Sequence, residues 1–202
     1  MSGTSDLAAA IGTTLELEAE ALREVANNYD VGQVQRVIDA IQACTGKVVT
    51  SGCGTSGTAA RKISHTLSCI ECPSLFLEPA DAVHGGLGVV QPGDVVILFT
   101  KGGQTEEMTA LIEPCQRKGA VVIGVTANPE SDLGRLSDIL LEVKVSREPD
   151  PFNMLATASI LAAIAVFDAI CIELMQRRGF SKAQFALIHP GGAVGKRLTA
   201  GE

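Results

Sequence analysis

The chain has 202 residues and a mass of 21.0 kDa, which is long enough to bury a full hydrophobic core. Hydrophobic residues make up 46% of it, so an ordered globular protein is expected rather than a disordered one. The formal net charge of -7 argues against a general surface for nucleic acids or anionic membranes, because such surfaces need clustered lysines and arginines.

Two features bear on location and redox state. The longest apolar stretch, 160–172, is interrupted by Asp168 and is shorter than the roughly 18 residues of a spanning helix, so we expect a buried helix and no membrane insertion. The N-terminus lacks the basic and apolar regions of an export signal, which predicts a cytoplasmic location and reduced cysteines. The Cys69-x-x-Cys72 pair has neither a second pair nor a histidine at ligand spacing, so we predict no metal site.

Helical and extended patterns alternate along the chain. Apolar residues recur at helical spacing over 15–26 and again over 31–44, which predicts two opening helices. Five apolar runs read as strands, and they cover 47–51, 73–77, 94–99, 120–125 and 139–143. Helices are expected from the loop 52–57 to about 69, from the loop 100–105 to about 118, over 153–176, and in a shorter stretch ending near 187.

Continuously apolar strands that alternate with helices are typical of a parallel sheet covered on both faces. We therefore predict the α/β class, as a three-layer α/β/α sandwich around a five-stranded parallel sheet. One domain is expected over 1–202, with opening helices in 1–45, a parallel α/β core in 46–150 and closing helices in 151–202.

Two loops rich in glycine and hydroxyl groups follow the first and third predicted strands. The carboxyl ends of parallel strands and the amino ends of the next helices meet at one edge of a sheet, where ligands bind. Helix N-termini stabilise an anion such as phosphate, and hydroxyl side chains suit an attached polyol. The predicted ligand is a phosphorylated sugar, held by Ser51, Gly54, Thr55, Ser56, Thr100, Lys101, Gly102, Gly103, Gln104 and Thr105.

Two alternative interpretations of these loops stay open. The hydroxyl residues could serve only as helix caps and the glycines only as turn residues. Gly52-x-Gly54-x-x-Gly57 also has the form of a dinucleotide-binding fingerprint, with Glu78 about 20 residues further on. Against the dinucleotide interpretation, the second loop has no role in that fold, and two helices precede the first strand.

The segment Gly52-Cys53-Gly54-Thr55-Ser56-Gly57 resembles the first phosphosugar loop of sugar isomerase (SIS) domains. The segments 78–88, 92–96 and 189–198, the last of which begins His-Pro-Gly-Gly, resemble the arabinose-5-phosphate isomerase branch of that family. The resemblance covers nearly the whole chain from the first helix. Members of this branch often carry a pair of cystathionine-β-synthase modules after this point, so the resemblance implies a stand-alone SIS domain here.

The resemblance implies an activity and four catalytic residues. Glu107, Glu148, His84 and His189 match positions that the family places at its active site. The implied reaction interconverts an aldose phosphate and a ketose phosphate through an enediol, which requires a base to move a proton between two carbons. A glutamate desolvated in the pocket is expected to have a raised pKa, which suits this task. No metal or organic cofactor is implied, and a homodimer or homotetramer is expected.

The sequence also departs from the isomerase branch at two places. That branch typically has a lysine where this chain has Thr55, and a Ser-Asn-Ser-Gly-Glu-Ser type second loop where this chain has Thr-Lys-Gly-Gly-Gln-Thr. One cation is lost from the first loop, and another, Lys101, is present in the second. The identity of the sugar is therefore open, and a non-catalytic phosphosugar sensor is the alternative function.

Overall fold

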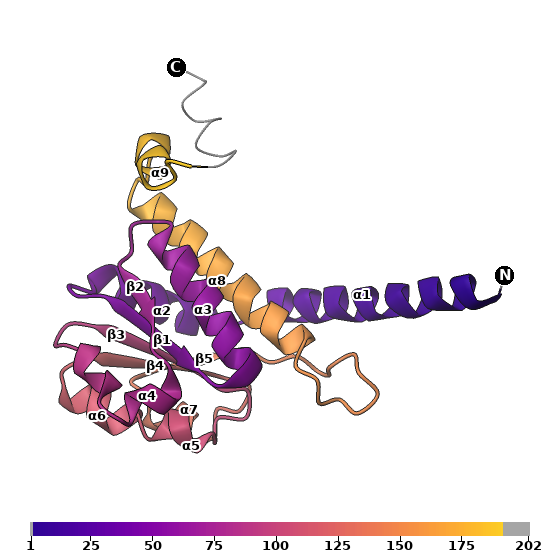
Figure 1. Ribbon diagram of the computed structural model, residues 1–202, viewed down its shortest axis with the longest axis horizontal. Helices are drawn as coiled ribbons and strands as arrows, with labels where there is room; N and C mark the ends of the chain where they lie inside the picture. The colour runs from indigo at the N-terminus through magenta and orange to yellow at the C-terminus, as the bar shows by residue number, and fades with distance from the viewer. Residues whose placement is uncertain (1, 192–202) are drawn as a thin grey trace.

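Five parallel strands form the sheet, in the order β2-β1-β3-β4-β5, in the computed structural model, which describes residues 2–191 (Figure 1). The strands are β1 (Val48–Gly52), β2 (Ser74–Phe76), β3 (Val95–Phe99), β4 (Val121–Thr126) and β5 (Ile139–Glu142). All five coincide with the predicted strands to within about two residues, and the order is that of flavodoxin-like folds. The predicted fold class is confirmed.

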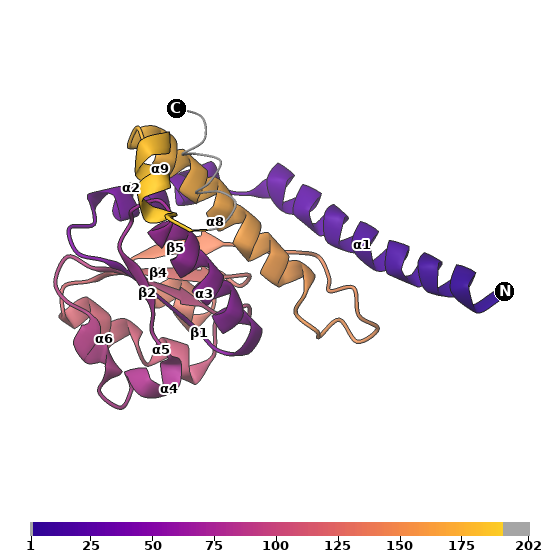
Figure 2. The same cartoon turned by 45° about the horizontal axis from the view of Figure 1, so that its top comes forward.

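Helices cover both faces of the sheet, as Figures 1 and 2 show. One face carries α1 (Ser2–Asn28), α2 (Val31–Ala43), α3 (Gly54–Ser68) and α8 (Ala158–Arg177). The other carries α4 (Pro79–Ala82), α5 (Glu106–Thr109), α6 (Ile112–Arg117) and α7 (Asp132–Leu136), and the short helix Gly86–Val89 follows α4. The last described helix, α9 (Lys182–Ile188), lies beyond the end of α8.

The position of the central strand β3 between two cores explains why its sequence is continuously apolar. Ile97 and Phe99 pack into the core beneath α3 and α8, whereas Val96 and Leu98 pack into the core beneath α5 to α7. Successive side chains of a strand point to opposite faces, so a strand covered on both sides needs apolar residues at every position. The Phe99 ring lies 5.3 Å from that of Phe167 on α8, which joins this helix to the sheet.

The apolar helix α8 is long and hydrophobic enough to cross a membrane by length and composition alone. In this fold its buried residues, among them Phe167, Ile170 and Leu174, instead pack against the sheet and its neighbouring helices. Packing between the sheet and the neighbouring helices accounts for the hydrophobicity of α8.

Two predicted helix boundaries were wrong, and both errors have local causes. The helix expected from 153 begins only at Ala158, because the Asp150 carboxylate accepts hydrogen bonds from the backbone N–H groups of Met154 and Leu155, at 2.8 Å each, and holds a turn there. The helix expected after the second loop divides into α5 and α6. Pro114 has no N–H to donate to the carbonyl of Ala110, so the helix cannot run through unbroken.

Candidate active site at the carboxyl edge of the sheet

The order of the strands creates a crevice at the carboxyl edge of the sheet. The chain leaves β1 toward β2 on one side and leaves β3 toward β4 on the other, so the two loops diverge. Gly52 pairs with Phe99 in register, and the two glycine-rich loops therefore start side by side. Such a switch point is where ligands bind in open α/β sheets.

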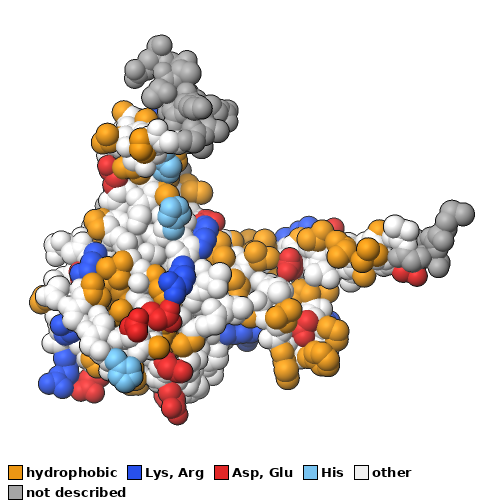
Figure 3. Space-filling view, in the orientation of Figure 1, with side chains coloured by type: hydrophobic (Ala, Val, Ile, Leu, Met, Phe, Trp, Pro, Cys, Tyr) orange, Lys and Arg blue, Asp and Glu red, His pale blue; other side chains and the backbone are white. Residues whose placement is uncertain are grey.

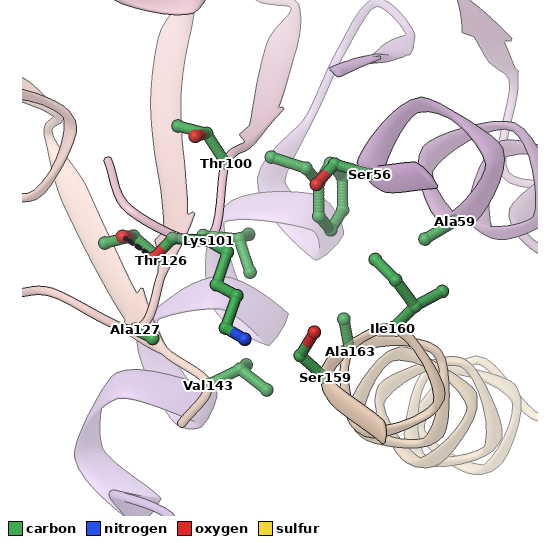
Figure 4. Close-up of a pocket in the computed structure, with 12 residues that line it drawn as sticks. Ser56, Ala59, Thr100, Lys101, Thr126, Ala127, Val143, Ser159, Ile160 and Ala163 are labelled. Carbon is green, nitrogen blue, oxygen red and sulfur yellow. Dashed lines mark hydrogen bonds between the residues drawn. The ribbon is translucent and has the colours of Figure 1, made fainter. Parts of the chain in front are cut away.

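A small pocket of about 30 Å³ opens in this crevice (Figure 4). Its polar lining comes from Ser56 on α3, Thr100 and Lys101 after β3, Thr126 at the end of β4, and Ser159 on α8. Apolar side chains, including those of Phe99, Val143 and Ala163, form the floor. This volume holds one or two water molecules and is well below the roughly 300 Å³ of small ligand sites, so the pocket is too small for a sugar phosphate as its side chains stand.

The first loop packs β1 tightly onto the start of α3. A side chain at Gly57 would place its Cβ 2.4 Å from the carbonyl oxygen of Gly52, so only glycine permits this approach. Gly54 adopts a positive φ of 56° and is exposed with Thr55, whereas Ser56 is half-buried and lines the pocket. The buried Ser51 hydroxyl donates to the carbonyl of Leu77 at 2.8 Å and ties β1 to the segment after β2.

The second loop is held in shape from within and by α7. The hydroxyls of Thr100 and Thr105 share a hydrogen bond of 2.7 Å across the loop. Gly103 has a positive φ of 73°, and a Cβ there would lie 1.8 Å from Ser131 Oγ, so a larger residue would displace the loop. With its amide nitrogen turned toward Asp132, Gln104 donates to Oδ2 at 2.8 Å. Gly102 and Lys101 are exposed positions of the loop.

Glu148 lies beside the pocket, where it bonds two of the lining residues, and it is fully buried, with 0% of its surface exposed. Its Oε1 accepts from Lys101 Nζ at 2.6 Å and from the Ser159 hydroxyl. Its Oε2 accepts from the backbone N–H groups of Thr157 at 3.0 Å and Ser159 at 3.3 Å. The carboxylate therefore caps the N-terminus of α8, where a negative charge is favoured by the helix dipole.

The pKa of Glu148 is lowered, which corrects the expectation of a raised pKa for this glutamate. Burial raises the pKa, but the hydrogen bonds from Lys101, Ser159 and the backbone of Thr157 outweigh burial. In this closed arrangement Glu148 is a stable carboxylate whose two oxygens are already occupied.

Glu107 comes from the second loop's helix and faces the first loop. It is exposed on α5. Burial of the Cys53 thiol, at the start of α3, is the main cause that raises the pKa of this thiol, and the negative charge of Glu107 raises it further. The two glutamates thus lie on different sides of the crevice, one exposed and one buried.

The two candidate histidines do not line the pocket of their own chain. His84 is exposed in the turn after α4. His189 ends α9, where its ring stacks on Phe185 at 4.1 Å. Because the 20 residues of α8 span about 30 Å, His189 lies far from Ser159 at the other end of that helix (Figure 1). The remainder of the His-Pro-Gly-Gly segment, from 192 onward, lies outside the described residues.

A sequence model of the SIS domain matches residues 42–173, from the end of α2 into α8. This chain belongs to the SIS domain family. The switch-point crevice described above lies within the matched region, so the pocket and both glycine-rich loops are parts of the SIS domain.

The relatives of this SIS domain include named isomerases. The arabinose 5-phosphate isomerase KpsF of Escherichia coli O6:H1 is 38% identical over 192 residues, which cover 95% of this chain and 59% of that protein. The arabinose 5-phosphate isomerase KdsD of Escherichia coli K12 is 39% identical over 184 residues, which cover 91% of this chain and 56% of that protein. The chain thus spans little more than half the length of these relatives.

Two solved structures share the architecture closely. A Listeria monocytogenes protein classed provisionally as a sugar-phosphate isomerase is 48% identical, with a TM-score of 0.91, and the match covers 95% of this chain and 100% of that one. An Escherichia coli CFT073 protein in complex with arabinose 5-phosphate is 33% identical, with a TM-score of 0.89, and the match covers 92% of this chain and 98% of that one.

Sequence reasoning missed the contribution of α8 to the site. Thr157 and Ser159 hold the Glu148 carboxylate, and Ser159 also lines the pocket. A hydroxyl residue just before an apolar run is a helix-start signal, so Thr157 and Ser159 offered a clue to where α8 begins. Nothing in their spacing linked them to Glu148.

Replacing Glu148 with Gln should lower the free energy of unfolding at neutral pH by about 2 kcal/mol, because a neutral amide replaces a carboxylate that accepts four hydrogen bonds. The folded pKa of Glu148 is lowered, so its stabilisation is present above the unfolded pKa of about 4.3 and is lost as pH falls through the folded pKa. Urea unfolding between pH 7 and pH 3 should therefore show the two proteins converging in acid. Glu107→Gln, at an exposed position, should match the wild type throughout, and a pH-independent difference for Glu148→Gln would contradict this account.

Proposed function

We propose that this SIS domain is a sugar-phosphate isomerase that interconverts an aldose phosphate and a ketose phosphate through an enediol. The observation that carries the proposal is the pairing of a lysine that lines the pocket between two hydroxyl-rich loops, Lys101, with a buried carboxylate beside that pocket, Glu148. The relatives named as arabinose 5-phosphate isomerases and the solved complex with arabinose 5-phosphate support a pentose phosphate as the first substrate to test.

The phosphate group has a binding place on this edge of the sheet. The N-terminus of α3 directs backbone N–H groups toward the crevice, and this 15-residue helix is long enough for its dipole to favour an anion. Among the described residues that line the pocket, Lys101 is the only one that carries a charge. Ser56, Thr100 and Thr126 add hydroxyl groups for the sugar.

The proton transfer needs one carboxylate near the reacting carbons. A base removes the proton on the carbon beside the carbonyl, the electrons of that C–H bond form the carbon–carbon double bond of the enediol, and the carbonyl π pair moves onto its oxygen, which is protonated. The proton then returns to the former carbonyl carbon, while the neighbouring hydroxyl loses its proton and becomes the new carbonyl. Glu148 and Glu107 are the two candidates on this edge, and Glu148 lies closer to the pocket because it bonds two residues that line it, Lys101 and Ser159.

We also propose that the protein assembles as a homodimer or homotetramer. The first half of α1 projects from the body and bears an apolar stripe of Leu7, Ile11 and Leu15, each at least 55% exposed (Figure 3). Such spacing forms one face of a helix and needs a covering surface. Assembly would also let His189, remote from its own pocket, act at the pocket of a neighbouring copy.

Incubation with ribulose 5-phosphate in heavy water should produce an aldose phosphate and place deuterium on carbon, which nuclear magnetic resonance detects directly. The enediol exchanges its proton through the base, so Glu148→Gln or Glu107→Gln, whichever removes the base, should slow the reaction by about 10²-fold or more.

The control experiment measures the binding of phosphosugars separately from their conversion to product. Phosphosugars should stabilise the wild type against heat, by about 2.7 kcal/mol at 100 times the Kd, while unphosphorylated sugars and NAD should not. If a pentose or hexose phosphate binds tightly, yet neither it nor its aldose or ketose isomer yields exchange or product, the protein is a phosphosugar sensor and the isomerase proposal is wrong.

Replacing Ile11 with Glu should reduce the assembled mass toward that of a single chain, because a charge in the centre of the stripe cannot be buried without a partner. Size-exclusion chromatography with light scattering measures this mass. Leu136→Glu, on the exposed side of α7, is the matched control and should leave the mass unchanged. A wild type that is monomeric at micromolar concentration would contradict the assembly proposal.

A further inference from the structure

The Lys101–Glu148 ion pair joins a lysine that lines the pocket to a buried carboxylate beside it. Lys101 extends from the end of β3 toward Ser159 on α8, as Figure 4 shows, and its Nζ lies 2.6 Å from Glu148 Oε1. With this contact in place the cavity measures about 30 Å³, far too small for a sugar phosphate. Room for a substrate therefore requires side chains that line the pocket to move, and Lys101 is one of them.

The two partners differ in how easily a ligand can reach them. The Lys101 side chain is 43% exposed, whereas that of Glu148 is 0% exposed. An incoming anion therefore meets the ammonium first. A phosphate group carries more charge than a carboxylate and presents three acceptor oxygens, so it competes well for that ammonium.

A second, independent observation at the start of α8 points to two ways of capping this helix. Thr157 is the N-cap residue of α8, yet its hydroxyl makes no cap bond and is buried without a hydrogen-bond partner among the described residues. An N-cap hydroxyl normally accepts from the second or third N–H of its helix, and here the second, that of Ser159, donates to Glu148 instead. The Thr157 hydroxyl is thus an unused N-cap group, and the Glu148 carboxylate beside it caps the helix instead.

We propose that the Lys101–Glu148 pair is a latch that the phosphate group of the substrate opens. The phosphate takes the ammonium of Lys101, the carboxylate of Glu148 turns from the N-terminus of α8 into the pocket, and the hydroxyl of Thr157 caps the helix in its place. This inference rests on the proposed isomerase function and names how that site is switched on.

The released carboxylate is a better base than the latched one. Burial raises the pKa of Glu148, and the bonds from Lys101, Ser159 and the Thr157 backbone hold it low. Release removes the bonds and leaves the burial, so the pKa rises toward the working pH. The carboxylate oxygen then takes the carbon-bound proton, the C–H electron pair forms the carbon–carbon double bond, and the carbonyl π pair moves onto its oxygen. That oxygen takes up the proton that the neighbouring hydroxyl group of the substrate gives up, and the carboxyl group of Glu148 returns its proton to the former carbonyl carbon. No other reactant is needed.

The test is a pH titration of the full chain labelled with ¹³C at the glutamate carboxyl groups, with and without inorganic phosphate. The Glu148 signal is identified by its loss in Glu148→Gln. We expect phosphate to move the Glu148 midpoint upward. In Lys101→Gln the midpoint should already be raised without phosphate, and phosphate should no longer move it, while Lys101→Arg should restore the wild-type response.

A matched control pair lies at the opposite edge of the sheet. Lys47 Nζ bonds Asp94 Oδ2 at 2.7 Å, and the Asp94 side chain is 1% exposed. Like Glu148, Asp94 has a lowered pKa: burial raises the pKa, but hydrogen bonds from Lys47 and from the backbone of Gln91 outweigh burial. Lys47→Gln should leave the phosphate response of Glu148 unchanged, which separates the latch from the general loss of a buried ion pair.

Thr157→Val tests the exchange of caps. The hydroxyl has no partner in the closed state, so this change of equal size should leave stability intact or raise it. It should nevertheless reduce the upward shift of the Glu148 midpoint and lower kcat for a sugar phosphate by about tenfold, the loss of one hydrogen bond. Thr157→Ser should keep both. A Thr157→Val protein with an undiminished response would overturn the cap exchange.

The outcomes separate this inference from the isomerase proposal. A wild-type Glu148 midpoint that phosphate does not move, or a response that persists in Lys101→Gln, overturns the latch even if sugar phosphates are isomerised. A normal phosphate response without any turnover of pentose or hexose phosphates retains the phosphate-driven release of Glu148 and overturns only the proposed reaction.

Discussion

A buried carboxylate must be paired, and the structure around the active site follows from how Glu148 meets this requirement. Leaving such a charge without partners in the interior costs several kcal/mol, so the chain supplies four donors to its two oxygens. Those donors come from the loop after β3 and from the first turn of α8. One side chain thereby holds the first turn of α8 and the ammonium group of Lys101.

The parallel sheet explains why these groups meet at all. Lys101 and Glu148 are 47 residues apart, and both follow strands that end at the same edge. The strand order reverses between β1 and β3, so the crevice opens between the two glycine-rich loops. The proposed anion site uses a helix N-terminus and hydroxyl groups, so an overall charge of -7 is compatible with binding a phosphate there.

The sequence was most informative where local patterns govern structure. The strands are continuously apolar because both faces of the sheet are covered, and both loops stand out because Gly57 and Gly103 occupy positions that reject a Cβ. Glu148 shows the limit of this approach. It lies in a turn of charged residues and prolines that reads as solvated, yet long-range contacts bury it and lower its pKa. The same contacts, unseen in the sequence, bring Thr157 and Ser159 to the candidate site.

The central claim is that the phosphate of a sugar binds between the N-terminus of α3 and Lys101. A crystal structure of the protein with arabinose 5-phosphate tests this most directly. The account predicts phosphate oxygens within hydrogen-bond distance of Lys101 Nζ and of backbone N–H groups of residues 54–57, with the sugar carbons facing Glu148. A phosphate bound elsewhere on the molecule, with the Lys101–Glu148 pair intact, would contradict it.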